Sequence, residues 1–214
     1  MTPDAMRDAR SLSRRTWLLG ILADGALALA GCATPQPPQQ SAEQPAAFAN
    51  EAFPVRRINR DHFDAAFLPA EVDNTTSERP GTIVVDTRAK QLYLVENNGK
   101  ALRYGIAVGA AGHAWKGQAV VGRKAKWPAW YPTDDMKQTA PGIPARIPPG
   151  DDNPLGARAL YLYQNGRDTL YRIHGTSEPW TIGTEASSGC IRMFNEDVIA
   201  LFDHVPVWAK VVVH

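Results

Sequence analysis

Cysteine is scarce in this chain, which has two, Cys32 and Cys190, among 214 residues. Small exported domains that rely on disulfides carry several cysteine pairs, so the scarcity excludes a disulfide-rich scaffold. A chain of this length can bury a hydrophobic core without cross-links. We therefore expect one ordinary domain with terminal segments, in which Cys190 is an unpaired thiol.

An excess of charge of either sign is also absent. The chain has 23 Lys and Arg residues against 22 Asp and Glu; the first 31 residues hold four of the former and three of the latter, which leaves 19 of each. Nucleic-acid-binding domains normally show a strong basic excess. No group of Cys, His and Asp residues has the spacing of a metal site. The sequence therefore predicts no nucleic-acid partner, no metal and no cofactor.

The apolar run from Trp17 to Ala30 is too short to span a membrane comfortably, which takes about 20 residues. It follows Arg14 and Arg15, an arrangement that resembles a twin-arginine export signal. Leu29-Ala30-Gly31-Cys32 resembles a bacterial lipoprotein box, in which Cys32 is acylated and becomes the new N-terminus. Cleavage by the ordinary signal peptidase after Ala30 is the alternative. We expect an exported, periplasmic protein that meets a membrane only through a lipid on Cys32.

Composition divides the chain into three segments. Residues 1–31 form the export signal, and residues 32–79 form a tether and an N-terminal extension. The stretch 33–52 is rich in Pro and Gln and too poor in large apolar residues to pack, which is typical of a tether. Apolar residues near Phe63 and Phe67 predict a short helix that covers the domain. The folded domain itself is expected over residues 80–214.

Short β-rich runs separated by turn signals predict a mainly β fold. The runs cover 82–86, 91–95, 104–108, 118–124, 159–163, 169–174 and 207–213. Asn98-Gly99 and Asn165-Gly166 predict tight hairpins, because both residue types tolerate the positive φ that such turns require. The first three runs are therefore expected to form a meander.

Two further elements are expected. Residues 127–155 are rich in Pro, Trp and Asp and show neither helical nor strand periodicity, which predicts a long irregular flap. After Cys190, Asn195 followed by two acids predicts a helix start, with Asn195 as N-cap. The apolar stripe of this helix consists of Val198, Leu201, Phe202 and Val205.

His174 and Cys190 are the candidate catalytic pair. A thiolate is the reactive form of cysteine, and a nearby imidazole can take its proton, so the two supply the minimum parts for nucleophilic acyl transfer. His174 ends a predicted strand at Gly175. An exported protein that keeps one unpaired thiol exposes it to oxidation, which indicates that the thiol itself is needed.

Arg192 lies two residues after Cys190, so in extended backbone both side chains project to the same side. Its guanidinium would favour the thiolate and bind a substrate carboxylate. The alternative is a structural pairing with Glu196, Asp197 or a carbonyl.

The residues before the thiol, Ser187, Ser188 and Gly189, predict a tight turn whose amides form an oxyanion hole with that of Cys190. We expect Ser187 to contact substrate as well. Serines in a turn are also common simply as turn formers. Trp130 lies in the predicted flap, where it either contacts substrate or packs against the domain.

These residues together resemble the signature of a known family, the YkuD-type L,D-transpeptidases of the ErfK/YbiS/YcfS/YnhG group. The matching residues are His174-Gly175-Thr176, Ser187-Ser188-Gly189-Cys190-Ile191-Arg192-Met193 and Asn195. The resemblance covers roughly residue 80 to the C-terminus, and the stretch before about residue 70 lies outside it.

The resemblance implies a β-sandwich-like catalytic domain over residues 80–214, with a short helix after the cysteine and a long irregular flap. It implies that Cys190 is the nucleophile and His174 the acid and base, and that the Gly175 carbonyl orients the imidazole. Similar enzymes attack a peptidoglycan tetrapeptide stem, release its terminal D-alanine and form a thioester. The amine of an acceptor stem then gives a 3→3 cross-link. Many members have histidine where this chain has Ser188, so no role of that side chain is carried over.

Other functions remain open at this point. Water could resolve the thioester, which would make the enzyme an L,D-carboxypeptidase, or a protein lysine could do so in an anchoring reaction. A sortase-like transpeptidase is a second class, but there the arginine is expected far from the cysteine along the chain. A cell-wall-binding lipoprotein without catalysis is a third, which the presence of both His174 and Cys190 disfavours.

Overall fold

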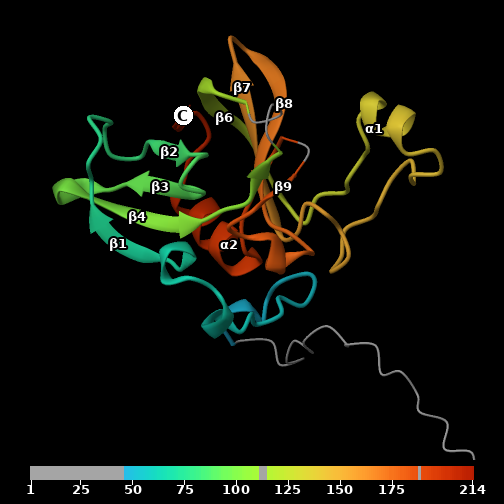
Figure 1. The fold of residues 1–214 in the computed structure, drawn as a ribbon, viewed down its shortest axis with the longest axis horizontal. Coiled ribbons are helices and arrows are strands. Elements are labelled where there is room, and N and C mark those ends of the chain that lie inside the picture. Colours follow the sequence, from blue (N-terminus) through green and yellow to red (C-terminus); the bar gives the residue numbers. More distant parts are fainter. Residues whose placement is uncertain (1–45, 111–114, 188) are drawn as a thin grey trace, which may run out of the picture. The chain divides into compact units, whose positions relative to one another are not determined.

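The computed structural model describes residues 46–110, 115–187 and 189–214, which belong to one compact unit. The predicted export signal, Cys32, the tether up to residue 45 and Ser188 lie outside the described residues. Within the described ranges the chain is mainly β-structure, as predicted (Figure 1). The strands are β1 (Ala70–Asp73), β2 (Ile83–Asp86), β3 (Gln91–Val95), β4 (Lys100–Gly105), β5 (Val108–Gly109), β6 (Gly117–Lys126), β7 (Arg158–Gln164), β8 (Arg167–His174), β9 (Glu185–Ser187), β10 (Ile191–Arg192) and β11 (Lys210–Val213).

Nine of the strands form one mixed sheet, in the order β1-β4-β3-β2-β11-β6-β7-β8-β10, and β5 pairs with β9 in a separate ribbon. The predicted meander is confirmed, because β2, β3 and β4 pair antiparallel in sequence order. The C-terminal strand β11 joins the two halves of the sheet, since it lies parallel to β2 and antiparallel to β6.

Both Asn-Gly pairs form the turns that their chemistry predicts. Asn98 and Gly99 have φ values of 66° and 71°, and Asn165 and Gly166 have values of 52° and 75°. Positive φ at both central residues matches the right-handed twist of the flanking strands, which is why this dipeptide favours hairpins. The second turn connects β7 to β8, the strand that carries His174.

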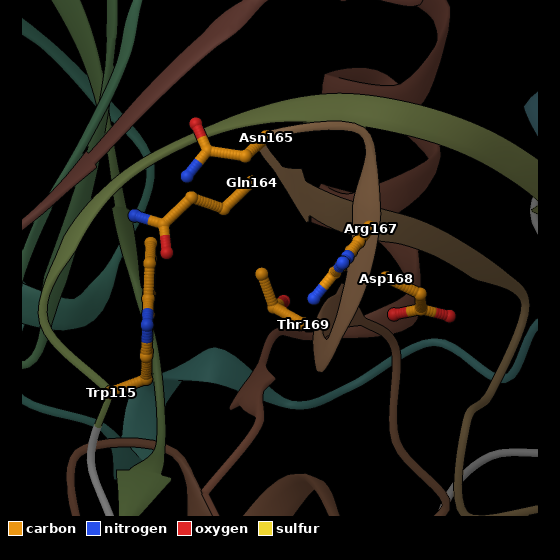
Figure 2. A pocket seen from close by; sticks show the side chains of 6 residues that line it. All are labelled: Trp115, Gln164, Asn165, Arg167, Asp168 and Thr169. Atoms are coloured by element: carbon orange, nitrogen blue, oxygen red, sulfur yellow. The ribbon is translucent and has the colours of Figure 1, made fainter.

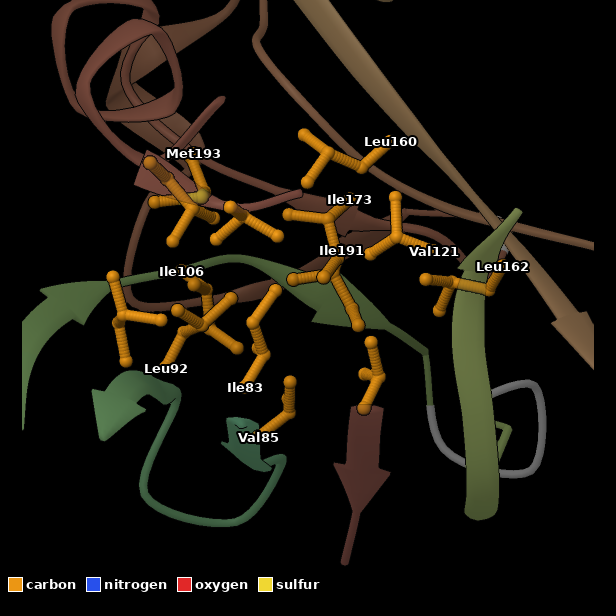
Figure 3. Packing of buried hydrophobic residues seen from close by; sticks show 14 of the residues in the cluster. Ile83, Val85, Leu92, Ile106, Val121, Leu160, Leu162, Ile173, Ile191 and Met193 are labelled. Atoms are coloured by element: carbon orange, nitrogen blue, oxygen red, sulfur yellow. The ribbon is translucent and has the colours of Figure 1, made fainter. Parts of the chain in front are cut away.

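The hydrophobic core lies between the two halves of the sheet. Ile83 and Leu92 from one half face Leu160 and Ile173 from the other, and all four are fully buried (Figure 3). At about 25 cal/mol per Å² of apolar surface, burying such side chains is the main force that holds the halves together. The two halves enclose one core, which is the sandwich-like arrangement expected.

Helix α2 (Asn195–His204) follows the cysteine and packs on β7 and β8. Its predicted apolar stripe is confirmed as buried. The predicted cap is wrong by one residue, since Phe194 is the N-cap and makes no side-chain capping bond. None of the helices among the described residues is long and apolar enough to cross a membrane.

The N-terminal extension is part of the folded unit from residue 46 onward. Val55 is buried with Trp127 and Ile199, and Phe48 and Phe53 pack against this cluster. Three 3-10 helices, η1 (Ala46–Phe48), η2 (Arg60–His62) and η3 (Ala65–Phe67), stand where the sequence predicted a tether and one short helix. Strand β1 then extends the sheet before residue 80, a pairing that the sequence analysis did not expect.

The predicted flap is irregular except for helix α1 (Asp134–Thr139), which the sequence analysis missed. The Thr133 side chain accepts a hydrogen bond from the Met136 amide, and two acids occupy the first turn, so the helix has an ordinary N-terminal cap. Two short elements complete the described chain, η4 (Asn97–Gly99) and η5 (Pro179–Thr181).

Candidate active site

Strand pairing brings the two candidate catalytic residues together. Strand β10 lies parallel to β8, with Ile191 beside Ile173 and Arg192 beside His174. The two isoleucines are buried in the core, at 5% and 0% exposure, so their neighbours in each strand project to the opposite side of the sheet. Cys190, one residue before Ile191, therefore lies beside β8 just before the strand reaches His174.

His174 is held in one tautomer by the backbone. Its Nδ1 lies 2.6 Å from the carbonyl oxygen of Gly175. A carbonyl can only accept a hydrogen bond, so Nδ1 carries the proton and Nε2 is left as the basic nitrogen. Among the described residues, no carboxylate is recorded as bonding to this imidazole, and the orienting group is the glycine carbonyl.

The imidazole is buried and neutral. Its exposure is 4%. Burial, together with the nearby guanidiniums of Arg192 and Arg172, lowers the pKa of His174 from 6.5 to about 4, in spite of the opposing effect of the Gly175 bond. A neutral imidazole at physiological pH can accept a proton, which is what a general base requires.

Cys190 is a partly exposed free thiol. Burial of its sulfur raises its pKa above the usual 9.0, although a backbone hydrogen bond from Arg172 and the charges of Arg172 and Arg192 favour the thiolate. The Sγ atom also lies 3.9 Å from the carbonyl oxygen of Leu170. The resting site therefore contains a thiol and a neutral imidazole.

The turn before the thiol is closed by Ser187. The buried Ser187 hydroxyl donates to the Cys190 carbonyl at 2.5 Å and accepts from the Gly189 amide at 3.2 Å. The Ser187 hydroxyl is therefore used within the turn, in line with the alternative that this serine is a turn former, and its contact with substrate stays a prediction. The Gly189 amide is bound there as well, so among the described amides of this turn the Cys190 amide is the oxyanion-hole candidate. Gly189 has φ 129°, a conformation that favours glycine.

Arg192 makes a structural ion pair. Its Nη1 donates to Glu178 Oε2 at 2.8 Å, and only 16% of the arginine side chain is exposed. The alternative partners expected from the sequence, Glu196 and Asp197, instead pair with Arg60 of the N-terminal extension. The Arg192 guanidinium thus fixes the loop that carries Glu178 beside the thiol, and its charge still acts on His174 and Cys190.

Asn195 has a role that the sequence analysis missed. Its Oδ1 accepts from the amides of Ala157 and Thr176 at 3.0 and 3.2 Å, and its Nδ2 donates to the Thr176 carbonyl at 3.0 Å. The side chain lies so close to Gly175 that a Cβ there would be 2.1 Å from Oδ1. Asn195 therefore fixes the loop whose Gly175 carbonyl orients His174.

Arg172 was also missed. It lies on β8 on the same side as His174, and its guanidinium pairs with Asp168 at 3.4 Å. Strand alternation places Arg172 and His174 on one face of β8, but the proximity of Arg172 to the thiol depends on the pairing of β8 with β10, which local periodicity does not encode.

A pocket of about 580 Å³ lies at the β7–β8 hairpin (Figure 2). The lining residues are Trp115, Gln164, Asn165, Arg167, Asp168 and Thr169. Thr169, which lines the pocket, directly precedes Leu170, whose carbonyl faces the thiol. The pocket therefore lies next to the part of β8 that contacts Cys190. Trp130 lies in the flap, as expected, where its backbone pairs with Ile147; its contact with substrate stays a prediction.

No group of three or more His, Cys, Asp and Glu residues in the described part of the chain is arranged to hold a metal ion.

Comparison with known proteins agrees with this arrangement. A family model described as "YkuD: L,D-transpeptidase catalytic domain" matches residues 80–213. "Probable L,D-transpeptidase ErfK/SrfK" of Escherichia coli (strain K12) is 34% identical over 150 residues, which are 67% of this chain and 47% of that protein. The chain thus spans about half the length of this relative.

Two other similar proteins cover more of their own length. "Putative L,D-transpeptidase in ATP synthase subunits region ORF 5" of Fuscovulum blasticum is 31% identical over 193 residues, 89% of this chain and 93% of that protein. A solved structure from Brucella melitensis, described as "Probable carnitine operon oxidoreductase caia", is 47% identical and covers 69% of this chain and 94% of its own, with a TM-score of 0.49. Because the family model matches more than half of the chain and includes His174 and Cys190, the chain belongs to the L,D-transpeptidase catalytic domain family.

Proposed function

We propose that this chain is a peptidoglycan L,D-transpeptidase that forms 3→3 cross-links through a thioester on Cys190. The observation that carries the proposal is the buried, neutral His174, whose Nδ1 is fixed by Gly175 on the strand beside the thiol. Membership of the family supports the substrate class, the stem peptides of peptidoglycan.

In the first half of the reaction, Nε2 of His174 takes the thiol proton as the Cys190 sulfur attacks the carbonyl carbon between the third stem residue and D-alanine. The negative charge develops on the carbonyl oxygen, where the Cys190 amide is the proposed donor. The C–N bond then breaks, and the leaving D-alanine amine takes the proton from the His174 imidazolium. The products are a thioester on Cys190 and free D-alanine, with the imidazole neutral again.

In the second half, the side-chain amine of an acceptor stem attacks the thioester carbonyl. His174 removes one proton from this amine, the C–S bond breaks, and the proton returns to the departing sulfur. The new amide is the cross-link, and no water is consumed. Water in place of the amine would release a tripeptide, which is the carboxypeptidase outcome.

Product masses test this function. The purified protein is incubated with disaccharide-tetrapeptide, and we expect a cross-linked dimer one D-alanine lighter than two substrates. Accumulation of tripeptide without dimer would instead identify a carboxypeptidase, and unchanged substrate would reject catalysis on this stem. Cys190→Ala is the control and should leave the substrate intact.

We further propose that the mature protein is exported and begins at an acylated Cys32, which would hold the catalytic domain at the membrane beside peptidoglycan. The lipoprotein-like Leu29-Ala30-Gly31-Cys32 supports this proposal. Mass spectrometry of the mature protein should find acyl chains on Cys32. An unmodified N-terminus further along the chain would reject it.

A further inference from the structure

A row of side chains crosses the sheet and ends at the thiol. Arg123 of β6 lies opposite Tyr161 of β7, and Tyr161 lies opposite Arg172 of β8. Since Ile191 pairs with Ile173, the next position back places Cys190 beside Arg172. Residues directly opposite in adjacent strands project from the same face, so all four belong to one row.

Two guanidiniums in this row share one aromatic ring. The Cζ atoms of Arg123 and Arg172 lie 3.4 and 4.9 Å from the centroid of the Tyr161 ring. Tyr161 is only 6% exposed, so its ring is held in place between the two guanidiniums. The cation–π contacts stabilise the two cations near each other, in spite of their mutual repulsion.

Negative charge in the row is scarce. Within the described residues, the ion pair recorded for Arg172 is a long contact of 3.4 Å to Asp168, and none is recorded for Arg123, which is exposed. Arg192, the other cation at the thiol, differs because Glu178 holds it at 2.8 Å. Two aligned guanidiniums with so little acid around them form a surface that attracts an anion.

The position of Arg172 indicates which anion would bind. In the acyl donor, the residue that leaves carries a free carboxylate next to the amine released from the attacked carbonyl. Arg172 stands beside Cys190, in the adjacent strand about 5 Å away. We propose that Arg172, supported by Arg123 on the Tyr161 ring, binds the terminal carboxylate of the leaving residue and so selects stems with a free C-terminus. This assignment rests on the proposed function and adds the group that recognises the donor end.

Binding to a protein that cannot react separates recognition from chemistry. In the full chain with Cys190→Ala, the dissociation constant is measured calorimetrically for disaccharide-tetrapeptide and for the same compound with its terminal carboxylate amidated. We expect amidation to weaken binding about 10- to 100-fold, the loss typical of a hydrogen-bonded ion pair.

Substitutions of the arginines then test which side chain causes the preference for the free carboxylate. Adding Arg172→Gln should weaken binding of the acid peptide by a similar factor and leave the amidated peptide unchanged, so the variant no longer distinguishes the two. Arg123→Gln, at an exposed position where folding is not at risk, should reduce the discrimination more weakly. Arg88→Gln removes an exposed arginine from the turn after β2 and should change neither affinity.

Undiminished discrimination in both Arg172→Gln and Arg123→Gln would overturn the proposal, as would equal weakening of the two peptides. Failure of the inactive protein to bind either peptide would overturn it too. A different result would reject the proposed function itself: the wild-type protein would form neither dimer nor tripeptide from the tetrapeptide. If the wild-type protein makes dimer but the inactive protein binds the acid and the amidated peptide equally well, the proposed function holds and the proposed role of Arg172 and Arg123 is rejected.

Discussion

At the scale of single residues, the protonation of His174 and Cys190 determines when the site reacts. The pKa of His174 is lowered to about 4 and that of Cys190 is raised, so at neutral pH the pair is imidazole and thiol rather than imidazolium and thiolate. The proposed attack by Cys190 therefore depends on proton transfer to Nε2 in the same step, and not on a thiolate formed beforehand.

This protonation state predicts an unusual pH profile. The kcat/KM for the tetrapeptide should stay level from pH 7 down to about 5 and fall only near the His174 pKa of about 4. Alkylation of Cys190 by iodoacetamide should rise steeply only in the alkaline range, because the thiol pKa lies above 9.0. An acid limb near pH 6.5 would show that His174 titrates with its ordinary pKa, and an alkylation plateau below pH 7 would show a preformed ion pair. Either result would contradict this account.

Asn195 gives a second prediction at this scale. Asn195→Ala removes three hydrogen bonds that fix the loop at Gly175 and Thr176, so we expect a loss of about 2–3 kcal/mol in the free energy of unfolding, measured with denaturant. The kcat should fall as well, because the carbonyl that orients His174 is no longer fixed. Asn195→Asp keeps the acceptor oxygen and should lose less stability. Equal stability of the alanine variant and the wild type would show that the loop at Gly175 and Thr176 keeps its conformation without the Asn195 hydrogen bonds.

At the scale of elements, strand β8 combines regular pairing with one irregularity. Its register against β7 shifts after Tyr161, and Leu170 has φ 65° and is 62% exposed. Asp168 and Thr169 side chains bond the amides of Leu170 and Tyr171, which holds the bulge. The bulge turns the Leu170 carbonyl toward Cys190, in keeping with the frequent use of bulges beside active sites.

The N-terminal extension supplies a buried charge partner to the domain. Arg158 of β7 is 1% exposed, and Glu51 binds it through both carboxylate oxygens while also accepting from Trp127 Nε1. The Nε atom of Arg158 has no recorded partner, so its guanidinium depends strongly on Glu51. The extension is thus tied to the sheet by charge as well as by apolar contacts.

Removing that partner should therefore be costly. Glu51→Ala leaves a buried, unpaired guanidinium, and we expect a loss of about 3 kcal/mol in the free energy of unfolding. The matched control is Asp73→Ala, which breaks an ion pair with Lys100 at the surface and should change stability little. Similar effects of the two substitutions in thermal unfolding would mean that Arg158 finds another partner or water.

Local patterns in the sequence predicted much of the fold and of the site. Asn-Gly pairs predicted both hairpins, and the two-residue spacing placed Cys190 and Arg192 on the same side of the backbone. These features depend on neighbouring residues, which is why a single sequence reveals them.

The features that were missed depend on contacts between distant segments. Glu51 binds Arg158, which is 107 residues away in the sequence. Arg192 pairs with Glu178 rather than with Glu196 or Asp197, the acids that follow it in helix α2. The bulge at Leu170 breaks the expected alternation, and a bulky residue at positive φ has no local signal. Tertiary pairing, rather than propensity, determines each of these.

At the scale of the whole molecule, the buried imidazole links stability to pH. An unfolded histidine titrates near 6.5 and His174 in the fold near 4, so between these values the unfolded chain binds more protons than the folded one. The stabilising contribution is therefore present above pH 6.5 and is lost as the pH falls toward 4. A shift of this size corresponds to about 3 kcal/mol.

Denaturant unfolding at a series of pH values between 7 and 4 checks this linkage. The wild type should lose more stability over the range than His174→Asn, and the difference between the two slopes isolates the imidazole from the carboxylates. Parallel slopes would show that His174 titrates normally in the fold.

The central claim is that Cys190 carries the acyl group, and the most direct test is the mass of the intact protein during turnover with disaccharide-tetrapeptide. Acid quenching in the first turnovers should reveal a species heavier by the donor minus D-alanine, and peptide mapping should place the added mass on Cys190. The Cys190→Ala protein should acquire no such mass. Product formation without an adduct on Cys190, or the same adduct in Cys190→Ala, would contradict the account.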